Sequence, residues 1–509
     1  MKKQILVVTI LSVLLCTFVM SQESIVFDQR FSLDYGIGFN DGKQTSDNGY
    51  IGVGFLSQTM LDDSYLIIRT DSLGNMEWYN YFGMQHSQLW GVDQTVDGDY
   101  IAAGFNAENP EWEDRAVLIK YNQTGDTIWK KEYLSPNTPA DTVFSQSYFY
   151  DLICTRDTAI VAVGGCFYTD GIYHGGSGTD PFIVKTDYNG DTIWTWRAYI
   201  HNDPEFGVSN VVYFSSVAET PEGDYIAVGY SDYPVVLNNK TGPNGGVLAK
   251  FSKNGELLFF KEFHDVAYTI FSDVEIDSQG NIVVFGDKIN YGAIGDNESG
   301  LVVKFDADGN VLFYRLISSI KSVVGRAGCV TKNDEILFIG WLIPPDELEW
   351  WEDTWLIKYD VNGEKLWEKV IGGKTSVNYL HNIRATTDNG LVLFGSYGDI
   401  NHHAWIVKTD SLGNGVYEQG WQNSINHAQF ISDVNVYPNP ASDFVIIELP
   451  DLKTSYNLSI YNMTGQLVYC KENNDEKSCI FIEDYPEGIY IIKIQSDKMV
   501  YTGKLSVKH

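Results

Sequence analysis

The sequence predicts an all-β protein made of a seven-bladed β-propeller and a small C-terminal β-sandwich. Two short sequence motifs, which we call phrases, each recur seven times along the first part of the chain, which indicates an array of equal units. Each unit holds four strand-like segments separated by turn signals, as a propeller blade does. The periodicity stops after Trp421, and a shorter set of alternating segments follows it.

The first phrase is plainest between Lys358 and Trp367. An apolar run ends in the lysine, a turn closes on Gly363, and a second strand opens with the aromatic residue. The seven copies comprise Arg69, Gly74 and Trp78; Lys120, Gly125 and Trp129; Lys185, Gly190 and Trp194; Lys250, Gly255 and Phe259; Lys304, Gly309 and Phe313; Lys358, Gly363 and Trp367; and Lys408, Gly413 and Tyr417. We expect each aromatic residue to fill the gap that widens toward the outer edge of its blade, and each basic residue to meet nearby turn carboxylates.

The second phrase is an apolar run that ends in glycine and stands before each copy of the first. Its seven glycines are Gly54, Gly104, Gly164, Gly229, Gly286, Gly340 and Gly395. Turn signals such as Asp97-Gly98 precede it and supply the positive φ of a short hairpin. One unit therefore has strand a, a tight turn, strand b, a variable loop, strand c, a tight turn, strand d and a second variable loop. A stacked solenoid of β-hairpins is the alternative to a closed ring.

Closure of the ring has two candidates. Residues 25–31 resemble a strand d and stand before the first strand a, so pairing with the last blade would join the two ends of the propeller and remove an exposed edge. Residues 417–421 could instead complete the last blade locally. We favour residues 25–31.

The N-terminus has the pattern of a signal peptide. Lys2 and Lys3 precede an apolar run over residues 5–20 that is too short for a membrane span, and we place cleavage before Gln22. The expected organisation is a signal peptide at 1–21, a propeller at 22–422, a linker at 423–432 and a C-terminal domain at 433–509. A formal net charge of −32 disfavours nucleic acid and anionic membranes as partners.

Five cysteines remain in the mature chain. Cys470 and Cys479 flank a polar segment symmetrically, so a hairpin centred there would place them at disulfide distance. Cys154 and Cys329 lie in apolar runs and are expected to be buried thiols. No Cys or His spacing predicts a metal site, and no cofactor is expected.

The c–d phrase resembles the Asp-x-x-x-Gly-x-x-x-Trp repeats of quinoprotein-dehydrogenase-like propellers, over roughly residues 25–425. That superfamily includes enzymes and pure scaffolds. The present sequence lacks the adjacent cysteine pair of the quinone-binding members and has seven units where they have eight, so the resemblance implies the fold and not the redox chemistry.

The C-terminal segment opens with Tyr437-Pro438-Asn439-Pro440, continues with an Asn-x-x-Gly-Gln turn at Gly465, and ends with Gly488-Ile-Tyr490 and a strand that contains Lys504. These motifs resemble the type A C-terminal sorting domain of the type IX secretion system of Bacteroidetes. The resemblance implies export through the periplasm by that machinery, to the cell surface or the medium.

The variable b–c and d–a loops emerge on one face of a propeller, and ligands commonly bind there. Two of these loops place tryptophan beside carboxylates: Glu111 and Trp112 in one, and Glu349, Trp350, Trp351, Glu352 and Asp353 in the other. Aromatic side chains beside hydrogen-bond acceptors suit sugar rings and protein hot spots equally. Such tryptophans can also serve only to anchor their loops to the blade. We expect a binding protein for a glycan or a protein, without catalytic residues. A polysaccharide hydrolase or lyase is the alternative.

Overall fold

The computed structural model describes two compact units, Met1–Gly420 and Trp421–His509, which are treated separately below. The described residues are 25–57, 63–83, 87–106, 114–133, 142–170, 177–198, 211–231, 245–263, 268–289, 298–319, 322–343, 353–372, 378–398, 402–417, 430–431, 435–448, 456–462, 467–473, 477–483, 485–495 and 500–508. Among these residues, no helix is long and apolar enough to cross a membrane.

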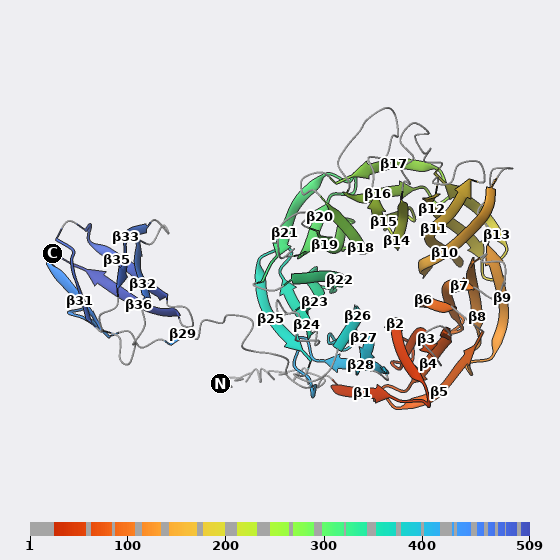
Figure 1. Cartoon of the computed structure of the whole chain (residues 1–509), viewed down its shortest axis with the longest axis horizontal. Helices are drawn as coiled ribbons and strands as arrows, with labels where there is room; N and C mark the ends of the chain where they lie inside the picture. The colour runs from red at the N-terminus through yellow and green to blue at the C-terminus, as the bar shows by residue number, and fades with distance from the viewer. Residues whose placement is uncertain are drawn as a thin grey trace, which may run out of the picture. The chain divides into compact units, whose positions relative to one another are not determined.

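The first unit is a ring of seven four-stranded antiparallel sheets (Figure 1). Blades 1 to 3 are β2 (Gly36–Gln44), β3 (Tyr50–Ser57), β4 (Asp63–Thr70) and β5 (Met76–Phe82); β6 (Gln88–Gln94), β7 (Tyr100–Asn106), β8 (Arg115–Tyr121) and β9 (Thr127–Tyr133); and β10 (Thr142–Cys154), β11 (Ala159–Asp170), β12 (Ser177–Asp187) and β13 (Thr192–Arg197). Blades 4 to 6 are β14 (Val212–Glu219), β15 (Tyr225–Ser231), β16 (Gly245–Phe251) and β17 (Leu257–Glu262); β18 (Thr269–Ile276), β19 (Ile282–Lys288), β20 (Ser299–Phe305) and β21 (Val311–Ile317); and β22 (Ser322–Val330), β23 (Ile336–Ile343), β24 (Asp353–Tyr359) and β25 (Lys365–Ile371). Blade 7 is β26 (Asn378–Ala385), β27 (Leu391–Tyr397), β28 (His403–Thr409) and β1 (Phe27–Phe31). The prediction of seven blades is confirmed.

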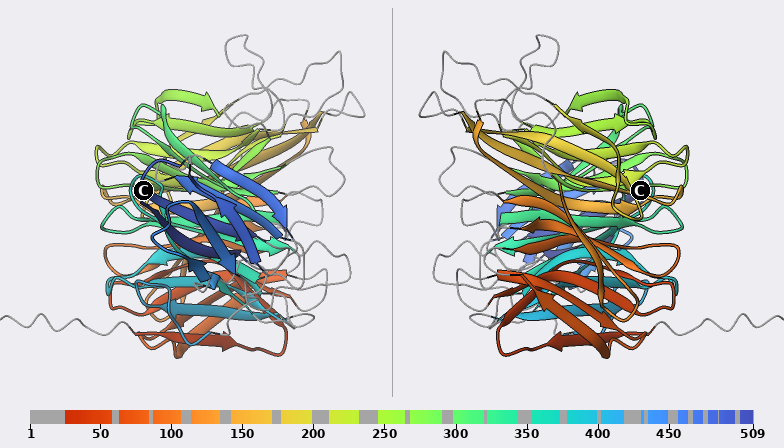
Figure 2. Two further views of the ribbon diagram at one scale, coloured as in Figure 1. Left: turned by 90° about the vertical axis from the view of Figure 1, so that its left-hand side faces the viewer. Right: turned by 90° about the vertical axis from the view of Figure 1, so that its right-hand side faces the viewer.

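The ring is closed by the N-terminal strand, as predicted for residues 25–31. Strand β1 pairs antiparallel with β28, from Phe27 opposite Lys408 to Phe31 opposite Ala404. Both phenylalanines are buried and pack in a core shared with blade 1. The side views show the blades edge-on (Figure 2).

In six of the seven c–d phrases, the aromatic residue packs on the phrase glycine of the next blade. Trp78, for example, lies against Gly125, where an added Cβ would come within 2.6 Å of the indole, and its Nε1 donates to the carbonyl of Gln123. The other contacts are Trp129 with Gly190, Trp194 with Gly255, Phe259 with Gly309, Phe313 with Gly363, Trp367 with Gly413, and Phe27 with Gly74. The phrase therefore joins neighbouring blades. In blade 7, the contact with the glycine of the next blade is made by Phe27 of the closing strand and not by Tyr417.

The basic residue of each phrase forms an ion pair with a carboxylate of the a–b turn in its own blade, as expected. Lys408 is fully buried and its Nζ lies 3.0 Å from Oδ2 of Asp388. The other pairs are Arg69 with Asp47, Lys120 with Asp99, Lys185 with Asp157, Lys250 with Asp224, Lys304 with Asp277, and Lys358 with Glu335. Five of the c–d turns are closed by their own aspartates, and the other two by Asn122 and Ser252. Oδ1 of Asp306, for example, accepts hydrogen bonds from the backbone of Asp308 and Asn310.

The second unit is a two-sheet β-sandwich, as predicted. Its five-stranded sheet has the order β29 (Phe430–Ile431), β36 (Val500–Val507), β35 (Gly488–Gln495), β32 (Tyr456–Asn462) and β33 (Leu467–Asn473). Its three-stranded sheet has the order β30 (Asn435–Tyr437), β31 (Phe444–Glu448) and β34 (Lys477–Phe481). Asn439 joins the two sheets, because its side chain donates to the carbonyl of Lys504 and accepts from the backbone of Ser506.

The expected hairpin between Cys470 and Cys479 is wrong. Cys470 lies on β33 at the edge of one sheet, and Cys479 lies on β34 at the edge of the other. The chain passes from one layer of the sandwich to the other between them, so the two cysteines are not cross-strand neighbours. Both are exposed free thiols in the structure.

Candidate functional site

The first strand of every blade carries a one-residue β-bulge at the same place. The extra residues are Asn40, Trp90, Tyr150, Ser215, Ser272, Arg326 and His381. The register partner just before each bulge is the glycine that ends the second sequence phrase, and a Cβ added at Gly164 would lie 1.8 Å from the carbonyl oxygen of Tyr148. The glycines are therefore required by the bulge, which re-aims side chains of the innermost strand toward the ring's centre.

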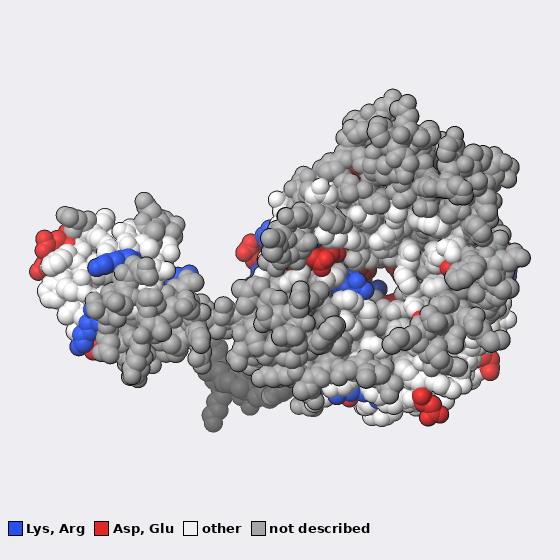
Figure 3. All heavy atoms as spheres, in the orientation of Figure 1, with Lys and Arg blue, Asp and Glu red and all other residues white. Residues whose placement is uncertain are grey.

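Two cavities lie along the centre of the ring. The larger, about 640 Å³, is lined by the first halves of these innermost strands and by the residues that flank the β19–β20 connection; we call it the funnel. The smaller, about 270 Å³, is lined by the second halves of the strands. Five residues line both cavities and form what we call the waist: Asp41, Asp151, Ser216, Asp273 and Arg384. A central opening with acidic and basic side chains near its rim is visible in Figure 3.

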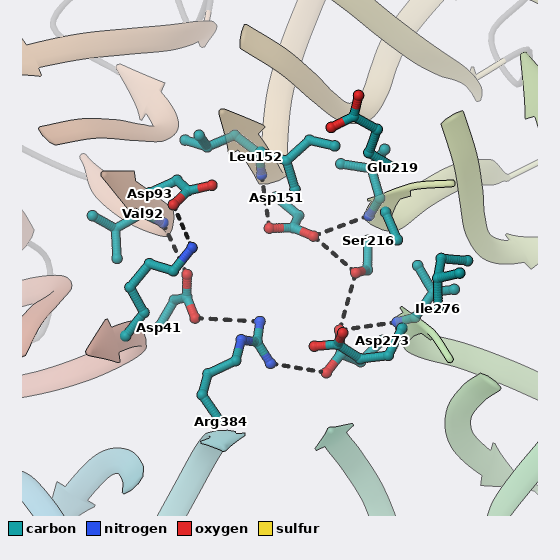
Figure 4. Close-up of a pocket in the computed structure, with 16 residues that line it drawn as sticks. Asp41, Val92, Asp93, Asp151, Leu152, Ser216, Glu219, Asp273, Ile276 and Arg384 are labelled. Carbon is teal, nitrogen blue, oxygen red and sulfur yellow. Dashed lines mark hydrogen bonds and ion pairs between the residues drawn. The ribbon is translucent and has the colours of Figure 1, made fainter. Parts of the chain in front are cut away.

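Aspartates of the waist connect neighbouring blades (Figure 4). Three blades, 1, 3 and 5, place an aspartate directly after the bulge, and each aspartate accepts a hydrogen bond from the backbone of the following blade. These bonds run from Val92 to Asp41 (2.8 Å), from Val217 to Asp151 (3.0 Å) and from Gly328 to Asp273 (3.1 Å). Blades 2, 4 and 6 have Gly91, Ser216 and Ala327 at the equivalent position, and blade 7 has Asn382.

The charges of the waist are incompletely matched. The Arg384 guanidinium lies 3.3 Å from Oδ2 of Asp273 and 3.8 Å from Oδ1 of Asp41. The Ser216 hydroxyl lies 2.8 Å from Asp151 and 3.0 Å from Asp273 and can donate to only one of them at a time. Burial, together with the nearby Asp41 and Asp273, raises the pKa of Asp151 to about 7. Burial also raises the pKa of Glu275, in the smaller cavity, to about 7 despite the attraction of Arg384.

These pKa shifts predict a stability maximum on the acid side of neutrality. Asp151 and Glu275 favour the folded state when protonated, and this contribution is lost as pH rises from their ordinary values, ~4, toward 7. Hydrogen bonds from the backbone of Asn310 and Glu364 lower the pKa values of Asp306 and Asp360, whose contribution is lost as pH falls below ~4. Thermal unfolding should therefore occur at the highest temperature near pH ~4–5. Asp151→Asn should flatten the decline toward pH 7; a midpoint that rises across this interval in the parent protein would contradict the prediction.

One wall of the funnel is aromatic. The Trp90 and Tyr150 rings lie 4.7 Å apart between centroids, and Tyr150 lies 5.5 Å from Tyr213. All three side chains are only partly buried and line the funnel. They come from blades 2, 3 and 4, so three consecutive blades form one continuous aromatic surface.

The opposite wall is polar and charged. Asp287 and Glu298 flank the β19–β20 connection, and burial together with Glu298 raises the pKa of Asp287 to about 7. The Arg326 guanidinium lies 4.0 Å from the ring centroid of Trp341. Burial and the charge of Arg326 lower the pKa of His381 to about 3, so its imidazole is neutral at neutral pH. Carboxyl, guanidinium and imidazole groups thus face the aromatic wall.

The site proposed from the sequence falls mostly outside the described residues, where Glu111, Trp112, Glu349, Trp350, Trp351 and Glu352 all lie. Asp353 is described: it begins β24 and is 4% exposed, a burial that does not fit an acceptor displayed to a ligand. Sequence reasoning missed the residues of the funnel and the waist. The glycine that ends each strand b was a usable signal for them, because it marks the bulge on the paired strand a.

The fold and the motifs define an exported β-propeller protein with a C-terminal sorting domain. Residues 435–508 match the family of secretion system C-terminal sorting domains, which confirms the resemblance drawn from the Tyr437–Pro440 motif. The domain indicates handling by the type IX secretion system and delivery to the cell surface or the extracellular space. No curated protein sequence matches the chain significantly.

Similar solved structures include a secretion-system surface component, the propeller domain of a protease and a polysaccharide lyase. PorZ, a surface component of the type IX secretion system of Porphyromonas gingivalis, shares 10% identity over 95% of this chain and 100% of its own, with a TM-score of 0.25. The propeller domain of the Trilobed protease from Pyrococcus furiosus shares 10% identity over 78% and 99%, with a TM-score of 0.40. An ulvan lyase, a polysaccharide lyase, shares 11% identity over 81% and 91%, with a TM-score of 0.40. At these scores the likenesses carry no argument about function.

Proposed function

We propose that the propeller is a non-enzymatic binding module that takes a glycan into its funnel, at the cell surface or outside the cell. The observation that carries this proposal is the pairing of an aromatic wall, Trp90, Tyr150 and Tyr213, with a wall of hydrogen-bonding groups that includes Asp287 and Arg326. Sugar rings present apolar faces and polar edges, so they are complementary to such a pair of walls.

The shape of the funnel favours a glycan over a folded protein. A cavity of about 640 Å³ lies within the usual range for small-ligand sites. A stable protein partner would need roughly 800 Å² of surface on each side, far more than the mouth of one cavity offers. Residues Glu111, Trp112, Glu349, Trp350, Trp351 and Glu352 belong to b–c connections of blades 2 and 6, and we keep them as proposed contacts for the outer part of the same ligand.

Replacing Trp90 with alanine is expected to weaken glycan binding by about 10- to 100-fold, because it removes the end of the aromatic wall. A glycan array would identify ligands, and titration calorimetry would measure the loss. The matched control is Tyr79→Ala, which removes a 44%-exposed aromatic ring from the outer strand β5 and should leave affinity unchanged. Equal affinities of the parent and the Trp90 variant would place the ligand elsewhere.

A polysaccharide hydrolase remains the second candidate, and one observation favours it. A carboxyl group with a pKa of about 7, such as that of Asp287, can act as a proton donor at neutral pH, and Glu298 lies near it. Release of sugar from a bound glycan, lost in Asp287→Asn while binding persists, would establish an enzyme.

A further inference from the structure

Two buried acceptors at the base of the funnel lack hydrogen-bond donors among the described residues. They are Oδ1 of Asn382 and Oδ1 of Asp41, on side chains that are 7% and 6% exposed. The Arg384 guanidinium lies 3.8 Å from this oxygen of Asp41, beyond hydrogen-bond distance. Both side chains line the funnel, and they occupy equivalent positions in blades 7 and 1, which are neighbours in the ring. An unmatched buried acceptor is unfavourable, and a ligand that donates a hydrogen bond would remove that cost.

Acidic groups also outnumber basic groups in the lining of the funnel. Five carboxyl groups and two guanidinium groups line it. Arg384 pairs with Asp273 and Asp41, and among the described residues no basic side chain forms an ion pair with Asp151. The raised pKa of Asp151, caused by burial and then by Asp41 and Asp273, reflects the same deficit. A donor that is also a cation would satisfy both the acceptors and the charge.

The spacing of these groups suits an organic cation better than a metal ion. Among the described residues, no three His, Cys, Asp or Glu side chains are close enough together to hold a metal. An ammonium group is larger, carries three N–H donors, and can bridge acceptors that are too far apart to ligate one ion directly. The aromatic wall above the waist adds a surface that attracts cations.

We propose that the waist binds the primary ammonium group of an amino sugar, so that the glycan taken into the funnel is one with free amines. This inference rests on the proposed function and specifies its ligand. The ammonium group lies between Asp151 and Asp41 and donates to Oδ1 of Asp41 and Oδ1 of Asn382. The sugar ring that carries it stacks on the aromatic wall at Trp90 and Tyr150.

The test compares three β-1,4-linked tetrasaccharides that differ only at carbon 2 of each ring: glucosamine, N-acetylglucosamine and glucose. Titration calorimetry of the full exported chain near pH ~7 is expected to show at least about tenfold tighter binding of the glucosamine tetramer, the gain typical of a charge-assisted hydrogen bond. Asn382→Leu should reduce the preference for glucosamine over glucose by about tenfold. The Oδ1 that this variant removes makes no hydrogen bond among the described residues, so we expect the variant to fold.

A second variant guards against failure of the first to fold. Asp151→Asn removes an ionisable carboxyl group at the waist, and Glu256→Gln removes one on an exposed turn. Only Asp151→Asn should lower the preference for the amine. An equal loss in both variants would assign the effect to the overall charge of −32 and overturn the inference. Equal binding of all three tetramers would also overturn it while leaving glycan binding intact, whereas absence of binding to any glycan would overturn the proposed function itself.

Discussion

Replacing Asp388 with alanine is expected to destabilise the propeller by about 3–5 kcal/mol, the usual cost of leaving a buried charge without its partner. Lys408 has no exposed side-chain surface, and its ammonium group is held by Asp388 at 3.0 Å and by the carbonyl of Thr409 at 2.9 Å. Burial lowers the pKa of Lys408 even with the partner present. Urea unfolding of the purified variant would measure the change.

Two controls separate the buried charge from a general effect of losing an ion pair. Glu448→Ala breaks the exposed pair with Lys477 in the C-terminal unit, where 59% of the lysine side chain is accessible, and should cost far less than Asp388→Ala. The double variant Asp388→Ala with Lys408→Met should regain much of the lost stability, because no charge remains buried. A loss in Asp388→Ala no larger than that in Glu448→Ala would refute the argument.

Replacing Phe27 with alanine should cost about 3–5 kcal/mol by leaving a cavity at the closure of the ring. The Phe27 ring packs edge-on to Tyr50 at 5.4 Å and lies against Gly74, so it joins the last blade to the first. Ile25→Ala is the control, since that side chain is 37% exposed and precedes the strand. Thermal unfolding and the rate of proteolysis within residues 25–31 would report the loss. Similar values for both variants would mean that β1 does not hold the ring together.

The blade count and the closing strand could be predicted because each depends on local signals. A basic residue, a glycine and an aromatic residue at fixed spacing define a hairpin, and residues 25–31 look like the strand that such a hairpin would supply. The partner of the aromatic residue could not be predicted, because Trp78 contacts Gly125 across 47 positions of the chain. For the same reason the sequence could not show that Phe27, from the other end of the propeller, makes this contact with Gly74.

The funnel and waist escaped sequence reasoning for a different reason. A bulge shifts the alternation of a strand by one residue, so a simple period-two reading of β2 cannot tell that both Asn40 and Asp41 line the same cavity. The residues that face the centre also differ from blade to blade, as Trp90 and Arg326 do, and therefore give no repeated signal. The wrong prediction of a hairpin between Cys470 and Cys479 has another cause. Two strands that are close in the sequence can belong to different sheets, and the sequence does not show which sheet each strand joins.

The alternation of aspartate with small residues at the waist is affected by the odd number of blades in the ring. Aspartate and small residues can alternate without interruption only around an even number of blades, and this ring has seven. The mismatch falls where blade 7 meets blade 1, so Asn382 and Asp41 stand side by side as two acceptors. A ring with near-sevenfold symmetry would offer a ligand seven equivalent orientations. At the waist, the seam between blades 7 and 1 makes one of these orientations different from the rest.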